Sequence, residues 1–285
     1  MGIIDEQNIR REHNAMDAWT YTADFHTHTR HSDGKGSVLD NARFAEKVGL
    51  WYVGITDHGE RSIGRGVKRL EWAKIRDEVT EAQRKTGIKV LMGCEANVVS
   101  RDGEIDVPYQ VRKRMDVVLA GLHTLIYPNT LSDGLTLLAN NLVGARVSRR
   151  LRARARVDNT KAIVSAVHRN RIDIVSHPGL GLNIDTEELA AACSRRGTAL
   201  EISSAHEHIS REYIEIAARQ GVMFAFGSDA HRPEDVGNFA RAEALAKSAK
   251  VEPREVLNVR DTPAATGEKQ RFWHRLGLTG WPGEA

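Results

Sequence analysis

Asp24-Phe25-His26-Thr27-His28-Thr29-Arg30-His31-Ser32-Asp33-Gly34 is the stretch of this sequence that decides its fold and chemistry. It begins as a β-strand, in which side chains alternate between two faces, so His26 and His28 are expected to point the same way. Asp33, on the loop beyond, is a third candidate metal ligand. Two histidines and one carboxylate do not complete a catalytic metal centre. The stretch therefore predicts a metal site only if other segments supply further ligands.

The composition is that of an ordinary globular protein. Of 285 residues, 41% are hydrophobic and 28% are charged, and the net charge is +3. No apolar run approaches the roughly 18 residues that span a bilayer, and residues 1–6 lack the layout of a signal peptide. Two cysteines, Cys94 and Cys193, make no disulfide framework, so we expect a cytoplasmic location without membrane contact. The charge suits an anionic substrate and neither requires nor excludes a polyanionic partner.

Short apolar runs alternate with amphipathic segments, and this alternation predicts an α/β fold with a parallel sheet. The expected strands cover about 21–25, 51–56, 88–94, 116–122, 172–176, 198–202 and 222–227. The expected helices cover about 37–48, 68–85, 135–170, 186–196, 210–220 and 233–249. We predict one barrel domain over residues 21–250, with an amino-terminal extension over 1–20 and a carboxy-terminal extension over 251–285.

Polar residues stand at the carboxyl end of every predicted strand. They include His26 and His28, Asp57 and His58, Glu95, His123, Ser176 and His177, Glu201 and Ser203, and Ser228, Asp229 and His231. The ends of distant strands lie far apart in an open sheet, whereas a barrel gathers all of them on one rim. The sequence therefore predicts a closed barrel of seven strands.

Six of the twelve histidines fall at these strand ends, and three acidic residues join them. The candidate metal ligands are His26, His28, Asp33, His58, Glu95, His123, His177, Asp229 and His231. Any one of these histidines is ordinarily explained as a hydrogen-bonded rim residue. Together on one rim, however, the nine groups would leave costly buried charge unless cations neutralise it. Imidazole and carboxylate ligands without thiolate favour zinc, manganese or iron, and nine ligands require two or three ions.

The strand-end residues also form short motifs in a fixed order. The motifs are His26-Thr27-His28 with Ser32-Asp33-Gly34, then Thr56-Asp57-His58, Gly93-Cys94-Glu95, Gly121-Leu122-His123, Ser176-His177-Pro178 and Gly227-Ser228-Asp229-Ala230-His231. This set resembles the PHP (polymerase and histidinol phosphatase) family of metal-dependent phosphoesterases over about residues 24–240. The resemblance is greatest to stand-alone members and to the domain of bacterial X-family polymerases. It implies a distorted seven-stranded (β/α)7 TIM-like barrel that holds three metal ions.

The resemblance also implies how the ligands are shared. A first ion would take His26, His28 and Asp229, and Glu95 would bridge it to a second ion. The second ion would also take His123 and His177, and a third would take Asp33, His58 and His231. His31 is a rival of Asp33. The segment Ser203-Ser204-Ala205-His206-Glu207-His208 departs from relatives, which often carry an asparagine there and an arginine later, so substrate choice stays open.

Catalytic roles are expected for Glu95, as the bridging carboxylate, and for Asp57 and Arg65. Arg65 is expected to contact phosphate, because a guanidinium presents paired donors, and Arg61 or Lys35 are substitutes. Asp57 either orients an imidazole or protonates the leaving group, with support the favoured role. For His206 and His208, substrate binding at the pocket mouth and plain exposure are equally open alternatives.

The main hypothesis is a phosphomonoesterase that acts on a histidinol-phosphate-like or other small phosphorylated metabolite. The alternatives are a phosphodiesterase or 3′–5′ exonuclease on nucleic-acid ends, and a non-catalytic, metal-stabilised regulatory module. The sequence makes no prediction of oligomeric state.

Two further segments are unusual. The basic run comprises Arg146, Arg149, Arg150, Arg152, Arg154 and Arg156. Its spacing wraps around a helix, which favours a solvated helix over a nucleic-acid patch. The segment 272–281, with Phe272, Trp273 and Trp281, is aromatic, and we expect it to pack on the barrel or on a partner subunit.

Overall fold

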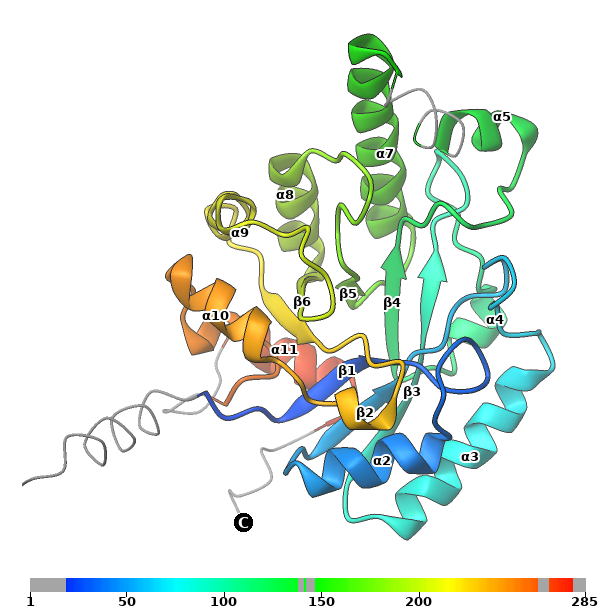
Figure 1. Cartoon of the computed structure of the whole chain (residues 1–285), viewed down its shortest axis with the longest axis vertical. Coiled ribbons are helices and arrows are strands. Elements are labelled where there is room, and N and C mark those ends of the chain that lie inside the picture. Colours follow the sequence, from blue (N-terminus) through cyan, green and yellow to red (C-terminus); the bar gives the residue numbers. More distant parts are fainter. Residues whose placement is uncertain (1–18, 138–140, 142–146, 261–266, 279–285) are drawn as a thin grey trace, which may run out of the picture.

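The computed structural model describes residues 19–137, 141, 147–260 and 267–278. Its seven strands form one parallel sheet in chain order (Figure 1). The strands are β1 (Ala23–Thr27), β2 (Tyr52–Ile55), β3 (Lys89–Asn97), β4 (Val117–Gly121), β5 (Ile174–Val175), β6 (Ala199–Ser203) and β7 (Phe224–Gly227). A parallel bridge between Thr27 and Ala230 joins the two edges of the sheet. The predicted seven-stranded α/β barrel is therefore confirmed.

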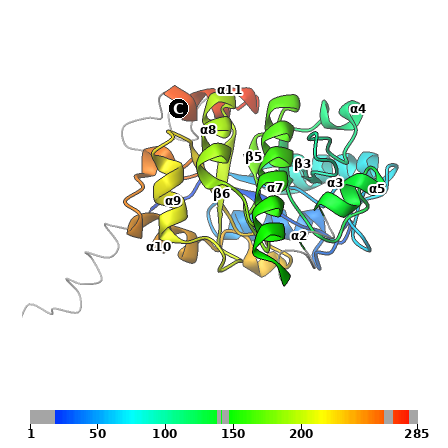
Figure 2. The ribbon, with the colours of Figure 1, turned by 90° about the horizontal axis from the view of Figure 1, so that it is seen from above.

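Helices surround the sheet, as Figures 1 and 2 show. They are α2 (Val38–Lys47), α3 (Glu71–Lys85), α4 (Tyr109–Arg112), α5 (Leu131–Asp133), α7 (Arg149–Arg169), α8 (Thr186–Arg196), α9 (Arg211–Ala218), α10 (Ala240–Ser248) and α11 (Gly267–Arg275), with 3-10 turns η2 (Pro233–Asp235) and η3 (Pro253–Glu255). Local sequence sets several helix ends. Ser37 and Asp40 form a capping box at the start of α2. Asp185 caps α8, which ends at Gly197 in the left-handed conformation (φ 65°).

The barrel interior at its amino end is an apolar core. The inward-facing residues near the strand starts include Ala23, Phe25, Tyr52, Val117, Leu119, Ile174, Ala199 and Ala225. Helix α11 covers them with Phe272, Trp273 and Leu276. Phe25 contacts both aromatic rings of α11, with centroids 5.5 Å away. The described part of the aromatic carboxy-terminal segment thus packs on the barrel, and Trp281 lies outside the described residues.

Two of the expected helices are wrong in extent. Of the expected helix over 135–170, the structure has α7 over Arg149–Arg169, and residues 138–140 and 142–146 lie outside the described residues. Asn141 donates a hydrogen bond to Asn159 in the middle of α7 (2.7 Å), and two residues 18 positions apart in one continuous helix could not make this bond. The expected helix over 233–249 is divided into η2 and α10 because Gly237 lies between them with a φ of 77°.

The ends of the chain are only partly covered by the structure. Residues 1–18 of the expected amino-terminal extension, and Arg146 of the basic run, lie outside the described residues. Trp19, the first described residue, stacks on Phe226 at a centroid distance of 5.6 Å.

None of the helices described here is both long and apolar enough to cross a bilayer.

Candidate metal centre

The nine candidate ligands converge at the carboxyl rim of the barrel. They form four overlapping groups in which the ligand atoms lie within 4.8 Å of one another. The groups are His28, Asp33, His58 and His231; His26, His28 and Glu95; His26, His177 and Asp229; and His58, Glu95 and His123. Shared members join these groups into one continuous cluster.

An irregularity in β1 turns its histidines toward this cluster. The register between β1 and β2 shifts between Asp24 and Thr27. Such a bulge displaces the alternation of side chains by one residue and is common beside active sites. Phe25 therefore packs in the inner core, while His26, the next residue, also faces the barrel interior and contacts Glu201.

Glu95 occupies the middle of the cluster. It lies within β3 and not at its end, because the strand continues to Asn97. Its Oε1 is 2.7 Å from His177 Nε2 and 3.2 Å from His123 Nε2. Its Oε2 is 2.9 Å from His58 Nδ1 and 3.5 Å from His26 Nε2. The two carboxylate oxygens thus face different sets of histidines.

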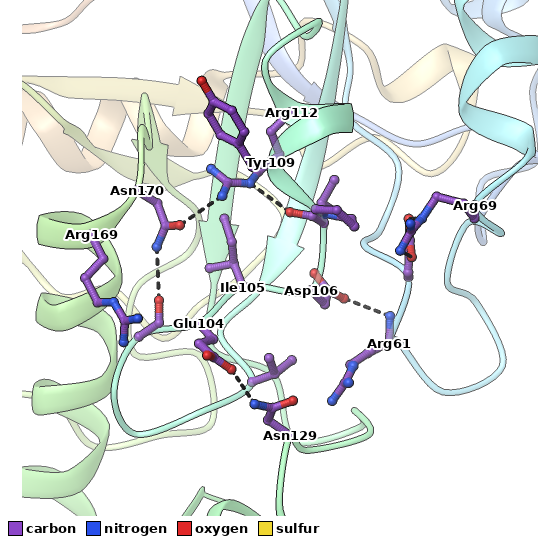
Figure 3. Close-up of a pocket in the computed structure, with 15 residues that line it drawn as sticks. Arg61, Arg69, Glu104, Ile105, Asp106, Tyr109, Arg112, Asn129, Arg169 and Asn170 are labelled. Atoms are coloured by element: carbon purple, nitrogen blue, oxygen red, sulfur yellow. Dashed lines mark hydrogen bonds and ion pairs between the residues drawn. The ribbon is translucent and has the colours of Figure 1, made fainter.

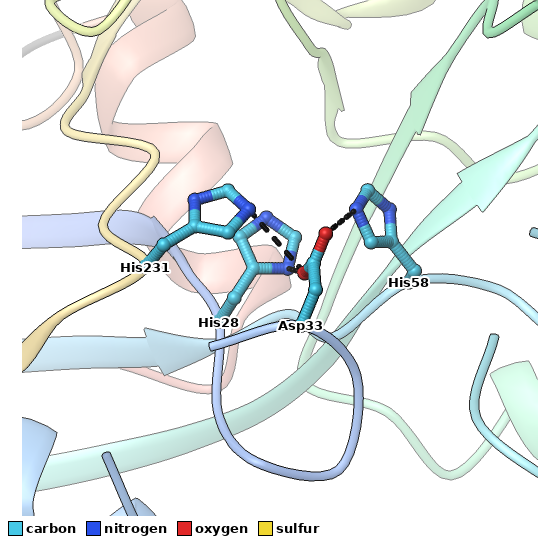
Figure 4. Close-up of side chains that lie close together, drawn as sticks. All are labelled: His28, Asp33, His58 and His231. Carbon is cyan, nitrogen blue, oxygen red and sulfur yellow. Dashed lines mark ion pairs between the residues drawn. The ribbon is translucent and has the colours of Figure 1, made fainter. Parts of the chain in front are cut away.

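Asp33 is a second carboxylate of the cluster around which several histidines gather (Figure 4). Its Oδ1 is 3.3 Å from His231 Nε2, and its Oδ2 is 3.3 Å from His58 Nε2. His28 stands behind it, with Nδ1 3.8 Å from Oδ1. His31, the rival of Asp33, instead directs its Nε2 to Glu78 at 3.0 Å. The geometry therefore favours Asp33.

Asp229 joins the two histidines of β1 to a residue from the loop after β6. Its Oδ1 is 3.1 Å from His28 Nε2 and 3.4 Å from His26 Nε2. Its Oδ2 is 2.8 Å from His206 Nε2. Asp229 and His177 are two of the three described non-glycine residues with positive φ, at 50° and 24°. Such strained backbone concentrates at functional sites.

Burial and neighbouring charges shift the pKa values of the cluster in opposite directions. Burial favours the neutral carboxyl of Glu95, but four nearby imidazoles outweigh it and hold its pKa well below its usual range. Burial likewise opposes the charged form of His58, yet Glu95 and Asp33 raise its pKa to about 9. Burial dominates at His123 and lowers its pKa to about 4. Ionised carboxylates thus stand beside imidazoles with a raised pKa, such as His58, and with a lowered pKa, such as His123.

Several buried polar atoms of the cluster make no hydrogen bond within the described chain. They are Glu95 Oε2, Asp33 Oδ1, both ring nitrogens of His58, and Nδ1 of His123 and His177. A buried polar atom without a partner costs free energy unless something else binds it. Imidazole nitrogens and carboxylate oxygens that face one space are the donor set of divalent transition metals. The residues present therefore fit metal ions.

Asp57 supports the loop that carries Asp33. Its buried carboxylate accepts hydrogen bonds from the backbone and hydroxyl of Thr29, both at 2.7 Å, and from the hydroxyl of Ser32. Ser32 Oγ in turn lies 3.5 Å from His28 Nδ1. In the described part of the chain Asp57 forms no hydrogen bond with an imidazole. Its contacts with the loop therefore replace the expected direct contact with an imidazole. This arrangement favours support over proton transfer.

The three cationic candidates separate in space. Arg65 reaches the cluster, with Nη1 3.2 Å from Asp33 Oδ2, and its buried Nε has no hydrogen-bond partner among the described residues. Arg61 turns away and donates to the carbonyl of Pro128 at 3.0 Å. It lines a pocket of about 400 Å³ together with Arg69, Arg112 and Arg169 (Figure 3). The exposed Lys35 has no side-chain bond to the cluster in the described chain. The expected contact of Arg61 with substrate at the centre is therefore not supported.

His208 lies beyond His206. Its Nε2 is 3.2 Å from the carbonyl oxygen of Pro178, and its ring centroid is 6.0 Å from that of His206. Burial, with the neighbouring imidazoles of His177 and His206, lowers the pKa of His208 to about 4. Of the two histidines, His206 is the one whose ring nitrogen lies beside the carboxylate of a candidate ligand, Asp229.

Sequence reasoning missed Glu201 as a site residue. This buried side chain of β6 lies 2.7 Å from His26 Nδ1 and accepts a hydrogen bond from the backbone N–H of His177. A signal was present, because Glu201 is an acidic residue within an apolar strand, as Glu95 is. It was absent from the ligand motifs and was therefore not counted.

Comparison with known proteins agrees with this geometry. Residues 24–205 match the model of the PHP domain. The chain belongs to the PHP family. It is 31% identical over 246 residues to a probable phosphatase of Thermoanaerobacter, covering 82% of this chain and 89% of that protein. A probable phosphatase of Caldanaerobacter subterraneus is 32% identical over 246 residues, with coverage of 82% and 86%.

The fold of this chain is similar to that of a solved structure. The histidinol phosphate phosphatase of Lactococcus lactis, complexed with zinc, L-histidinol and phosphate, superposes with a TM-score of 0.57 at 16% identity, covering 81% of this chain and 95% of the other. The predicted enzyme class, a phosphoric ester hydrolase, is confirmed by the family and its named relatives. The cytoplasmic location stays a prediction.

Proposed function

We propose that this PHP protein is a phosphomonoesterase with a trinuclear metal centre. The observation that carries the proposal is the position of Glu95, whose two oxygens face different histidines while Asp33 collects a further set next to them. A single ion would leave most of these ligand atoms unsatisfied. Three ions would give each set its own cation and would share Glu95 between two of them.

We assign the ligands to three sites as the family resemblance implies. Two sets of contacts support this division: Glu95 Oε1 lies beside His123 and His177, and Asp33 lies beside His58 and His231. The first site uses His26, His28 and Asp229, and the second uses His123 and His177, with Glu95 shared between the two. The third uses Asp33, His58 and His231, the set with His28 behind it in Figure 4. Zinc, manganese and iron all suit nitrogen and carboxylate ligands in this ratio.

The chain's own groups bind and orient the phosphate. Bound divalent ions would lower the pKa of water and neutralise the charge of the phosphoryl oxygens. Arg65, beside Asp33, presents paired N–H donors to the phosphate from the solvent side. Asp57 holds the loop of Asp33 in place through Thr29 and Ser32. The role of Glu95 is that of a bridge and not of a proton donor, because its low pKa keeps it ionised.

Exposure marks the side from which a substrate enters. Most of the ligands are almost fully buried. The side chains of His231, His206, Arg65 and Asp33 are 38%, 31%, 29% and 26% exposed. These four groups therefore form the mouth of the site, and a small phosphorylated metabolite would reach the centre past them. His206 is the proposed contact for the leaving group.

A substrate panel tests the proposal. The metal-free protein is loaded separately with Zn²⁺, Mn²⁺ and Fe²⁺ and assayed with p-nitrophenyl phosphate, histidinol phosphate and nucleoside monophosphates. We expect phosphate release with at least one metal, lost in the His26→Ala variant, and close to three ions per chain by mass spectrometry. Activity that is absent throughout, or unchanged in the variant, would contradict the proposal.

A second candidate is a phosphodiesterase or 3′–5′ exonuclease, favoured by the basic helix α7. Arg149, Arg150, Arg152, Arg154 and Arg156 are all exposed. The end of α7 that carries them projects beyond the neighbouring helices (Figure 1). Asp158 and Asp185 pair with Arg154 and Arg156, which reduces the charge available to a nucleic acid. Shortening of a labelled oligonucleotide, abolished in Glu95→Ala, would support this candidate, and an intact oligonucleotide would exclude it.

A further inference from the structure

Glu201 is a buried carboxylate that none of the proposed ion sites uses. It comes from β6, and its side chain is 1% exposed. Its two oxygens point to different partners, His26 from β1 and His177 from the end of β5. It therefore stands between one residue of the first proposed ion site and one residue of the second.

The contact with His26 selects the tautomer of that imidazole. Glu201 Oε1 lies 2.7 Å from His26 Nδ1, a distance at which an N–H donates to an ionised carboxylate. With the proton on Nδ1, the lone pair lies on Nε2. This is the nitrogen 3.4 Å from Asp229 Oδ1 and 3.5 Å from Glu95 Oε2. Glu201 thus directs the free lone pair of His26 into the cluster.

The contact with His177 holds a strained backbone. The N–H of His177 donates to Glu201 Oε2 at 2.6 Å, and His177 has a φ of 24°, which L-residues rarely adopt. In this conformation His177 Nε2 lies 2.7 Å from Glu95. A charged acceptor on the N–H offsets part of the strain.

Gly227 provides the room that Glu201 needs. A Cβ atom built at Gly227 of β7 would lie 1.8 Å from Glu201 Oε1. Any side chain at this position must displace the carboxylate. A substitution there consequently moves Glu201 without removing it.

We propose that Glu201 is a positioning residue that fixes His26 and His177 for metal binding by accepting one hydrogen bond on each oxygen. This inference rests on the proposed metal centre. It requires two acceptors at once, which only a carboxylate offers. A glutamine at this position has one oxygen and one NH₂ group, so one of the two N–H donors would face another donor. If the NH₂ group of the glutamine faces His26, the clash between donors is relieved when His26 moves its proton from Nδ1 to Nε2. Nε2 is the atom that must bind metal.

The first test is Glu201→Gln, with Asp173→Asn as the matched control. Asp173 is also a buried carboxylate, but it binds Val118 N–H and Arg275 at the other end of the barrel. Manganese affinity is measured by calorimetry on the metal-free proteins, and their stability by urea unfolding. We expect Glu201→Gln to weaken metal binding about 10- to 100-fold and to lower kcat more than it changes KM. Asp173→Asn should lower stability and keep the wild-type affinity.

The second test keeps the inference falsifiable if Glu201→Gln folds poorly. Gly227→Ala should reduce metal affinity in the same direction, and the double variant should lose little more than either single one, since both act through one carboxylate. Nitrogen NMR of labelled histidine should report the Nδ1–H tautomer of His26 in the wild type and its loss in Glu201→Gln. Wild-type affinity and tautomer in both single variants would overturn the inference.

Measurements of metal affinity also separate the proposed role of Glu201 from the proposed metal centre. If His26→Ala abolishes metal binding while Glu201→Gln binds normally, only the role of Glu201 is wrong. If His26→Ala also binds metal as the wild type does, the proposed centre itself is wrong.

Discussion

At the amino end of the barrel Phe25 packs against Phe272 and Trp273, whereas one residue further along the same strand His26 meets Glu201 and Glu95. The first end is apolar and closed by α11, and its contacts stabilise the fold without needing a ligand. The other end carries strained backbone and buried polar atoms that make no hydrogen bond within the described part of the chain. The barrel thus separates the part that stabilises the fold from the part whose side chains fit metal ions.

The largest expected effect is a loss of phosphatase activity when a ligand at the carboxyl end of the barrel is substituted. Glu95→Gln keeps the shape of the side chain but removes the charge that two sets of histidines share. Phosphatase activity should fall on the order of 10³-fold, more than the 10- to 100-fold typical of residues behind the ligands. Steady-state kinetics with saturating Mn²⁺ measures it, and metal content per chain should fall in parallel. A Gln variant with near-normal activity would remove Glu95 from the centre.

The opposite end should respond in stability and not in activity. Trp273→Ala removes a ring that packs on Phe25 and Tyr52 and whose indole N–H donates to Leu257 at 3.1 Å. We expect a loss of about 3–5 kcal/mol in the free energy of unfolding, measured by urea denaturation. Activity per folded molecule should stay unchanged, and Trp273→Phe should recover part of the stability. A large fall in kcat would show that the two ends are coupled.

Metal removal should lower the stability of the whole folded protein, through ligands that lie at the carboxyl end of the barrel. At a free metal concentration of about 100 times Kd, each bound ion adds about 2.7 kcal/mol to stability. This corresponds to a change in Tm of about 5–10 °C, measured by thermal unfolding with and without chelator. The shift should persist in Trp273→Ala and shrink in Glu95→Gln. Equal shifts in both variants would show that the ions bind elsewhere.

The smallest effect is expected at His31, although it lies only two residues from Asp33. His31 contacts Glu78 and not the cluster, and its side chain is 4% exposed, so His31→Ala should cost about 1–3 kcal/mol of stability without loss of activity. Its kcat/KM should equal that of the wild type. Asp33→Asn is the matched comparison and should lose most activity. The reverse pattern in the two assays would make His31 the ligand.

The sequence was sufficient for the fold and for the convergence of the nine candidate ligands, because both follow from strand order. Parallel strands in chain order place every carboxyl end on one rim, so the motifs had to meet. The choice between Asp33 and His31 could not be made this way, since it depends on how Asp57 binds Thr29 and Ser32 across two loops.

The failures have a common physical origin in contacts that are distant along the chain. Arg61 turns outward to the carbonyl of Pro128, and spacing alone does not reveal that bond. Glu201 was missed because its importance comes from its partners His26 and His177, which lie on other strands. A continuous helix over 135–170 was expected because the hydrogen bond between Asn141 and Asn159 cannot be inferred from the local sequence.

The closure of the amino end by α11 has a consequence for how the protein folds. Phe25 and Phe272 are about 250 positions apart, and α11 follows all seven strands in the sequence. The inner core therefore stays incomplete during synthesis until the residues of α11 have left the ribosome. Contacts between such distant segments slow folding, and apolar strands exposed in the meantime favour aggregation. We expect this chain to depend on chaperones more than a helical protein of equal length does.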